Sequence, residues 1–263
     1  MAAEPIIKIR DLCKQFNKNK VMEGLSLDVR QGETLVILGR SGTGKSVLLK
    51  HIIGISKADS GTIDIGGVRI SDLHGPKLYN ACINMGMLFQ GAALFDSMDV
   101  EENTGFFLKE HGDLQQGIDL SEKEIKIRVQ EALEMVGLAG TEKKMPSELS
   151  GGMRKRAALA RLIVYRPSIL LYDEPTTGLD PITAMQINEL IVQTQKQLKA
   201  TSIVVTHDIL SALYICDRLA LMNQGKIAHI DKPDAFMKID DPIIEFLRKT
   251  IIQDPHKIRE LHV

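Results

Sequence analysis

The chain has 263 residues, enough for one large domain or a domain with an inserted subdomain, and its 44% apolar residues can bury a sizeable core. Lysine and arginine total 33 against 34 acidic residues, a net charge of -1, which argues against nucleic acid as the main partner. No signal-peptide core is visible, and no apolar run reaches the ~18 residues that span a membrane, so we expect any action at a membrane to require a partner. The cysteines Cys13, Cys82 and Cys216 are far apart and lack metal-ligand spacing, which predicts reduced core thiols and a cytosolic compartment.

The first third of the chain predicts strands, one helix and a hairpin. Residues 6–16 and 25–39 alternate or run apolar in short pieces, as strands do. Residues 46–54, SVLLKHIIG, place apolar side chains at helical spacing and end at a glycine. Residues 61–70 predict a hairpin, because two short strand patterns flank a Gly-Gly pair.

From about residue 91 to 166 the pattern becomes mostly helical. Residues 121–138 begin with a capping box, Ser121 and Glu124, and stop at Gly137. One face of this predicted helix carries Ile125, Val129, Ala132, Leu133 and Val136. After it come three strand patterns and one helix pattern, at 168–175, 201–208, 218–230 and 182–198 respectively. This order predicts an α/β core, a helical subdomain inserted into it, and a helical tail after Pro233.

A glycine-rich segment follows the predicted strand ETLVIL and opens the next helix. Gly39, Gly44, Lys45 and Ser46 match the phosphate-loop pattern G-x-x-x-x-G-K-[ST], and Gly42 adds another flexible position. A backbone without Cβ atoms can wrap around phosphate oxygens, and the helix start adds its positive dipole end. Lysine reaches the β- and γ-phosphates, and the serine hydroxyl can ligate Mg²⁺. A chance glycine turn is the alternative, but the strand–helix context favours a phosphate loop.

Two carboxylates follow a second apolar strand pattern, in SILLYDEPTTGLD. Asp173 and Glu174 come directly after four apolar residues, where a buried charge is costly unless it is paired or used. We expect Asp173 to hold Mg²⁺ through water and Glu174 to polarise the attacking water as general base. A solvated strand end is the alternative, and the phosphate loop elsewhere in the chain makes it less favourable.

The segment LSGGMRKRAALARLIV, residues 149–164, resembles the signature region of the ATP-binding-cassette (ABC) ATPases. Ser150, Gly151 and Gly152 stand where a helix begins, so a hydroxyl and unused N–H groups converge on a possible anion site. In that family the signature of one subunit closes on the nucleotide held by the phosphate loop of another. Since this chain has one of each, the resemblance implies a homodimer.

The other landmarks of the family follow in the family's order. The resemblance implies that Phe16 stacks on adenine, although an ordinary core aromatic is the alternative. It implies that Gln90 senses Mg²⁺ and the γ-phosphate, that Asp180 lies in a loop acting across the dimer, and that His207 is the switch histidine. The nucleotide-binding residues it implies are Phe16, Gly39, Ser41, Gly42, Gly44, Lys45, Ser46, Val47, Ser150, Gly151 and Gly152. The catalytic residues it implies are Lys45, Gln90, Glu174, Asp180 and His207, and the metal ligands are Ser46, Gln90 and Asp173.

The resemblance covers about residues 6–230 and implies a P-loop NTPase fold that uses ATP and Mg²⁺. We expect an α/β, RecA-like core with an antiparallel β subdomain and an inserted α-helical subdomain. The predicted domain is a single ABC ATPase over residues 1–263. Its predicted parts are a nucleotide-binding core (1–90 and 166–232), a helical signature subdomain (91–165) and a C-terminal helical tail (233–263).

Within the family, MGMLFQGAALFDSMDVEEN and PSELSGGMRKRAALAR look like the ATPases of bacterial phospholipid-trafficking transporters of the Mla type. There the ATPase serves a membrane permease and an Mce lipid-binding protein, and it lies on the cytoplasmic face of the inner membrane. Arg40, where proline is common, and the run LIVYRP depart from the pattern. An ATPase of another importer or exporter (for amino acids or other small solutes) remains open. A soluble ABC ATPase acting on DNA or ribosomes, and a regulatory protein that binds ATP without turnover, also remain open.

Two further stretches have alternative interpretations. The basic run MRKR, residues 153–156, resembles a nucleic-acid patch, but we favour basic residues at a helix start beside phosphates and solvent. The stretch after Gln90 presents Leu94, Phe95 and Met98, and we expect it to bind a cytoplasmic helix of the permease. Four acidic residues lie beside them and could pair with basic residues of the permease: Asp96, Asp99, Glu101 and Glu102. The alternative is that Leu94 and Phe95 fill the core of the helical subdomain.

Overall fold

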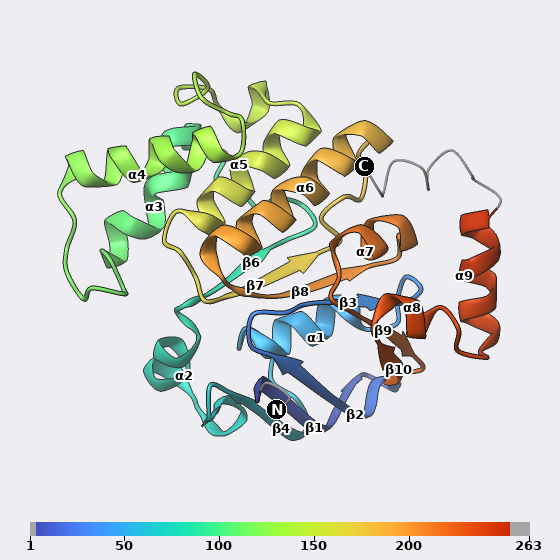
Figure 1. Cartoon of the computed structure of the whole chain (residues 1–263). Helices are drawn as coiled ribbons and strands as arrows, with labels where there is room; N and C mark the ends of the chain where they lie inside the picture. Colours follow the sequence, from blue (N-terminus) through green and yellow to red (C-terminus); the bar gives the residue numbers. More distant parts are fainter. Residues whose placement is uncertain (1–3, 253–263) are drawn as a thin grey trace. The chain divides into compact units, whose positions relative to one another are not determined.

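A computed structural model describes residues 4–252 of the chain. These residues form two compact units (Figure 1), one from 4–83 with 201–252 and one from 84–200. They contain no helix long and apolar enough to cross a membrane. The domain boundaries predicted from the sequence stay a prediction, because the second unit combines the predicted helical subdomain with neighbouring strands and one more helix.

The first unit contains an antiparallel sheet with the strand order β2-β1-β4-β5. Its strands are β1 (Pro5–Phe16), β2 (Asn19–Arg30), β4 (Ser60–Ile65) and β5 (Val68–Arg69). Ile7, Ile9 and Leu12 on β1 are fully buried. The predicted hairpin is confirmed: Gly66 and Gly67 join β4 to β5 with φ of 56° and 82°, a backbone that glycine adopts without strain.

Four further strands of the first unit lie in the order β10-β9-β3-β8. They are β3 (Thr34–Leu38), β8 (Thr201–Thr206), β9 (Arg218–Asn223) and β10 (Lys226–Asp231). Strand β3 is parallel to both neighbours, and every residue of β3 and β8 is buried, as expected for central parallel strands. The helices of this unit are α1 (Lys45–Ile52), η1 (Ile70–Asp72), α2 (Gly75–Cys82), α7 (Ile209–Ile215), α8 (Pro233–Phe236) and α9 (Pro242–Ile252).

The second unit combines two parallel strands with packed helices. The strands are β6 (Met85–Leu88) and β7 (Ile169–Asp173), and the helices are α3 (Val100–His111), α4 (Glu122–Met135), η2 (Pro146–Glu148), α5 (Gly151–Ile163) and α6 (Pro181–Leu198). Helices α3, α4 and α5 pack against one another, and α5 also packs on α6 (Figure 1). The predicted capping box of α4 is confirmed, since Ser121 accepts from the Glu124 amide and Glu124 accepts from the Ser121 amide. All five residues of its predicted apolar face are buried.

Two remaining predictions concern the tail and the cysteines. Helices α8 and α9 lie in the predicted C-terminal tail, whose residues 253–263 lie outside the described residues. Cys13, Cys82 and Cys216 form no disulfide. Cys82 is buried as predicted, whereas Cys13 and Cys216 are half-buried, because each lies at the margin of its packed layer rather than in the core. Burial raises the pKa of the Cys82 thiol. It raises the pKa of the Cys216 thiol to about 12, so both thiols stay protonated at neutral pH.

Candidate functional site

The phosphate-loop pattern lies between β3 and α1, as the sequence predicts. Gly42 and Gly44 have φ of 82° and 98°, values that residues with side chains rarely adopt. A Cβ atom at Gly39 would lie 2.8 Å from the Met222 carbonyl oxygen, and one at Gly44 would lie 2.6 Å from a Val21 methyl group. The glycines are therefore required by backbone conformation and close packing, and the loop forms a narrow cradle at the start of a helix.

Lys45 is buried within this cradle. Its Nζ donates to the carbonyl oxygens of Gly39 and Arg40, at 2.7 and 3.2 Å. Gly44 is the N-cap of α1 and supplies no side-chain hydrogen bond, so the first-turn amides of the helix point at the loop. A cationic side chain and backbone amides aimed at one loop suit phosphate oxygens, and the Ser46 hydroxyl offers the hard oxygen ligand that Mg²⁺ prefers. The residues present fit a nucleotide phosphate with its metal.

Two other predicted residues belong to the same unit. Strands β3 and β8 are parallel, with Leu38 opposite Thr206, so the phosphate loop and the exposed His207 follow neighbouring strands at one sheet edge. Phe16 ends β1 and its side chain is 47% exposed, which excludes the core alternative. The Lys14 ammonium lies 5.2 Å from the centre of the Phe16 ring, and stacking of Phe16 on adenine stays a prediction.

In the second unit, parallel pairing brings three predicted residues to one edge. Leu88 lies opposite Tyr172, so Gln90 and the Asp173–Glu174 pair follow neighbouring strand ends. Asp173 and Glu174 are 5% and 8% exposed, which is not a solvated strand end. Glu174 has a φ of 48°, a strained conformation for a residue with a side chain, and accepts a hydrogen bond from the Thr177 hydroxyl at 3.1 Å. This strain and burial are features that cluster at functional sites.

The structure corrects the interpretation of the basic run 153–156. Lys155 is 5% exposed and donates to the Gln90 carbonyl oxygen at 2.5 Å, and Arg156 bonds to Gln186 on α6. Burial lowers the pKa of Lys155, while the Asp173 and Glu174 carboxylates oppose that shift. The sequence reasoning missed Lys155 because nothing in a basic run distinguishes a buried lysine from solvated ones; the helical period would have placed it with buried Ala158.

The signature residues form the start of α5. Ser150 is its exposed N-cap and its hydroxyl oxygen accepts from the Met153 amide at 3.2 Å, which leaves the hydroxyl proton able to donate to a ligand. A Cβ at Gly152 would lie 2.6 Å from a Thr183 methyl group on α6, whereas Gly151 has ordinary room. Gly152 is therefore required by helix packing as well as by any ligand.

Asp180 has a local structural role that the sequence reasoning did not assign. It is the N-cap of α6 and accepts from the Ile182 and Thr183 amides, while the Thr183 hydroxyl donates to it at 2.6 Å. The Thr183 hydrogen bonds hold the pKa of this carboxyl below its ordinary range. A role of Asp180 across a dimer stays a prediction.

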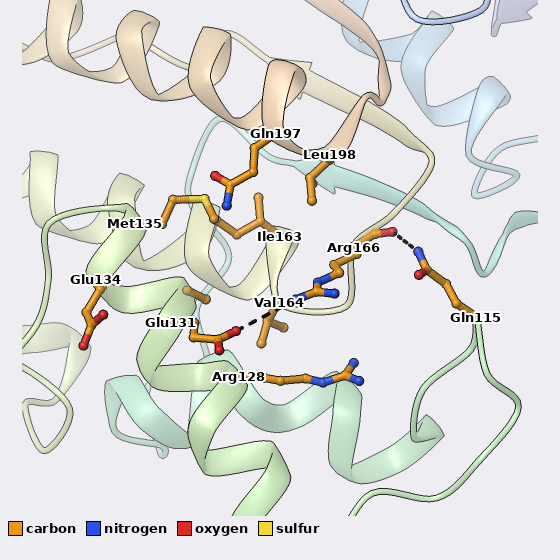
Figure 2. A pocket seen from close by; sticks show the side chains of 11 residues that line it. Gln115, Arg128, Glu131, Glu134, Met135, Ile163, Val164, Arg166, Gln197 and Leu198 are labelled. Carbon is orange, nitrogen blue, oxygen red and sulfur yellow. Dashed lines mark hydrogen bonds and ion pairs between the residues drawn. The ribbon is translucent and has the colours of Figure 1, made fainter.

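A pocket of the second unit lies away from the predicted site residues. Its volume is about 660 Å³. Figure 2 shows its lining side chains, among which Gln115 donates to the Arg166 carbonyl oxygen and Arg166 faces Glu131. It is lined by the end of α5, the end of α6 and one face of α4. None of the predicted site residues, all of which are described, lines this pocket.

The fold and the phosphate-loop geometry define a P-loop ATPase of α/β class, as predicted. A family model described as ABC transporter matches residues 22–177, more than half of the chain. The chain therefore belongs to the ABC transporter family, as an ATP-hydrolysing cassette that binds ATP with Mg²⁺.

Curated relatives support this membership. The probable ribonucleotide transport ATP-binding protein mkl of Mycobacterium leprae is 40% identical over 238 residues, covering 90% of this chain and 67% of the relative. Protein TRIGALACTOSYLDIACYLGLYCEROL 3, chloroplastic, of Arabidopsis thaliana is 36% identical over 259 residues, covering 92% and 73%. The methionine import ATP-binding protein MetN of Clostridium tetani is 38% identical over 234 residues, covering 89% and 71%. The chain spans about two thirds of the length of the mkl relatives that it matches, for example 65% of the length of the one from Mycobacterium tuberculosis strain H37Rv.

Solved structures show the same fold. A dimeric post-hydrolysis state of the ATP-binding cassette MJ0796 bound to ADP and Pi has a TM-score of 0.79 and 28% identity, covering 86% of this chain and 98% of that chain. The structure of cbiO1 from Clostridium perfringens, part of the ABC transporter complex cbiONQ, has a TM-score of 0.79 and 30% identity, covering 99% and 100%.

Proposed function

We propose that this chain is the ATPase subunit of a transporter that moves phospholipid through a separate membrane permease. The observation that carries this proposal is the phosphate-binding cradle of Gly39–Ser46, whose backbone conformation and close packing require glycine. The cradle lies in a chain of the ABC transporter family. Transport by a chain whose described residues contain no membrane-spanning helix would need a membrane partner. We place it at the cytoplasmic face of the inner membrane.

Each predicted residue has a role in this proposal. The cradle amides and Lys45 bind the phosphates, and Phe16 stacks on the base. Ser46, Gln90 and Asp173 would supply oxygen ligands to Mg²⁺, which neutralises phosphate charge when bound. Glu174 accepts a proton from the attacking water, and its burial and strained backbone keep its carboxylate in one orientation. His207 orients the phosphate end of the nucleotide.

A homodimer supplies the second binding surface in this proposal. Ser150 and the first amides of α5 form an exposed, outward-facing helix start that no phosphate loop of the same compact unit faces. We assign this surface to the nucleotide bound by a second copy. The dimeric state of the MJ0796 cassette, which is bound to ADP and Pi, supports this assignment.

The lipid branch rests on sequence likeness. The two stretches around Gln90 and Ser150 resemble phospholipid-trafficking ATPases, and one plant relative carries the name of a glycolipid. Relatives named for ribonucleotide transport and methionine import keep other solutes as a second candidate. An Mce-type lipid-binding protein is part of the lipid proposal.

The permease surface is proposed on the segment after Gln90. Phe95 is 36% exposed and Leu94 and Met98 are half-buried, which argues against the core alternative. The side chain of buried Asn103 holds this segment, because it bonds to the backbone of Phe95, Met98 and Asp99. An apolar pocket of about 200 Å³ lies beside it, and its walls include Ala92, Phe106 and Arg161.

The acidic part of that predicted surface needs correction. Asp99 and Glu101 both bind Lys143, at 3.2 and 2.8 Å, and Glu102 completes a capping box with Asp99. Three of the four acidic residues are therefore engaged within the chain and are poor partners for basic residues of a permease. The surface is apolar, with the Arg161 guanidinium 4.3 Å from the centre of the Phe95 ring.

The test compares substrates and one surface variant. The chain and a permease that co-purifies with it are placed in vesicles of phosphatidylethanolamine and phosphatidylglycerol, and lipid movement is compared with uptake of ribonucleotides and methionine. We expect ATP-dependent lipid movement, lost in Met98→Glu but kept in the control Gln130→Glu on α4. Movement of a nucleotide or methionine in place of lipid would overturn the lipid proposal. A Met98→Glu variant that still transports would move the permease surface elsewhere.

A further inference from the structure

Helix α5 contacts the segment after β6 through two buried or half-buried cations. Lys155, five residues after Ser150, donates to the Gln90 carbonyl oxygen at 2.5 Å. Arg161, nearly two turns further along α5, donates to the Ala93 carbonyl oxygen at 2.8 Å. The turn from Gln90 to Ala93 is therefore held at its first and last carbonyl by one helix.

The held turn is strained. Ala92 and Ala93 have φ of 65° and 54°, in the left-handed region that alanine avoids. Two successive residues with side chains persist there only where the surroundings over-determine the backbone. The hydrogen bonds from Lys155 and Arg161 on α5 hold the backbone of this turn in place. The Ala92 amide adds a further hydrogen bond, to the Phe89 carbonyl oxygen at 3.0 Å.

Lys155 is an expensive residue to place here for packing alone. A buried ammonium loses its hydration, and an apolar side chain of similar length would fill the space at lower cost. The Gln90 side chain, in contrast, is exposed, so only its backbone is restrained. The buried Lys155 ammonium fixes the Gln90 backbone, and this restraint determines the position from which the exposed Gln90 side-chain amide can reach a ligand.

We propose that Lys155 is a positioning residue for Gln90, and that through it Gln90 moves with the signature residue Ser150 on the same helix. The proposal rests on the role of Gln90 at the γ-phosphate. When Ser150 engages a nucleotide, the rigid α5 shifts the Gln90 carbonyl, and the exposed amide is brought to one orientation. Lys155 itself touches no substrate.

The first measurement uses Lys155→Met, with Lys109→Met, an exposed lysine on α3, as control. We expect kcat for ATP to fall roughly tenfold to a hundredfold while KM changes little, because misplacement of a group affects the transition state more than binding. In nucleotide-free protein we expect the amides of residues 90–93 to exchange with deuterium about tenfold faster, as local opening becomes easier. Parent-like kcat or parent-like exchange in Lys155→Met overturns the proposal.

A second pair of variants keeps the test decisive if Lys155→Met does not fold. Lys155→Arg keeps the length and the donor, whereas Lys155→Gln keeps a donor with shorter reach. We expect Arg to retain most of kcat and the slow exchange, and Gln to lose both. Equal behaviour of the two variants would show that the Gln90 contact has no positioning role.

Gln90→Ala separates this inference from the proposed function beneath it. If Gln90→Ala keeps the parent kcat, the assumed role of Gln90 fails, and the positioning proposal with it. If Gln90→Ala lowers kcat and Lys155→Met does not, only the positioning proposal is overturned. When both lower kcat, the double variant should be no slower than Gln90→Ala, because the two residues act in one chain of contacts.

Discussion

At the scale of single residues, Lys45 and Glu174 separate binding from chemistry. Lys45 is a buried cation whose ammonium donates to the carbonyl oxygens of Gly39 and Arg40 in the phosphate loop. Glu174 is a buried carboxylate on a strained backbone that places it directly after β7. A charge aimed into a cradle stabilises a bound anion, and a rigid carboxylate accepts a proton.

Lys45→Ala should abolish nucleotide binding without unfolding the protein. The substitution removes the buried side-chain cation of the cradle, and we expect ATP affinity to fall roughly a hundredfold or more, with hydrolysis lost in parallel. Isothermal titration with ATP and Mg²⁺ measures this. The control is Lys50→Ala, an exposed lysine on the same helix, which should bind as the parent does. Tight ATP binding by Lys45→Ala would contradict the phosphate-loop assignment.

Glu174→Gln should block the chemical step while ATP still binds. The amide keeps the shape and the Thr177 hydrogen bond but cannot accept the proton, so hydrolysis should fall by about 10²–10⁴-fold. The ATP-bound dimer should then persist, which size-exclusion chromatography with ATP and Mg²⁺ detects. Retained turnover, or loss of ATP affinity, would remove Glu174 from the role of base.

At the scale of elements, one ion pair joins the end of α3 to α4. Asp113 and Arg128 form a contact of 2.5 Å with little exposure on either side. The Asp113 carboxylate also accepts from the amides of Gln115 and Gln116, so it orders the connection between the two helices. The hydrogen bond from Arg128, with these amides, holds the pKa of Asp113 below its ordinary range.

The lowered pKa of Asp113 predicts a specific dependence of stability on pH. Because the folded state favours the charged carboxylate, the pair stabilises the protein above the unfolded pKa and this contribution is lost as pH falls through the folded value. Asp113→Asn should therefore lower Tm at pH 7, with the difference from the parent shrinking below about pH 4. Thermal melts from pH 3 to 8 measure this, with exposed Asp119→Asn as control. A difference that is constant across pH would argue against the ion pair.

Elements whose signals are local could be predicted from the sequence. The capping box of α4, the Gly-Gly hairpin and the glycines of the phosphate loop each depend on neighbouring residues, and each has the expected form. The hydrogen-bond partners of Lys155 and Asn103 could not be predicted, because the partner of a buried polar side chain depends on which segment packs over it. The sequence pattern did not predict helix α2, because only Cys82 of its eight residues is buried and the helix therefore has no apolar face at helical spacing.

At the scale of the whole molecule, the proposal requires two copies of the chain. Each copy has one phosphate loop and one signature, and the two features lie in different compact units of the chain. Loss of either feature from one copy should therefore lower ATP hydrolysis at the site that it shares with its partner. Variants in the two features make this dependence measurable.

Ser150→Arg should leave ATP binding intact and stop hydrolysis. A long cation at the exposed cap of α5 fills the space that the phosphate of the partner's nucleotide would occupy. When Ser150→Arg is mixed with Lys45→Ala, each mixed dimer keeps at most one intact site, so little activity should return. Phosphate release across a mixing series measures this, with exposed Ser147→Arg as control. Normal hydrolysis by dimeric Ser150→Arg would exclude shared sites.

The seam between α5 and α6 has a consequence for how this molecule can change over evolutionary time. At Gly152 there is no room for even one methyl group beside Thr183, and Arg156 bonds to Gln186 further along the same seam. The exposed caps of the two helices, Ser150 and Asp180, are therefore carried by a single stiff body. A substitution that separates the two helices moves both Ser150 and Asp180. The loops that precede α5 and α6 can therefore change their positions in evolution only together.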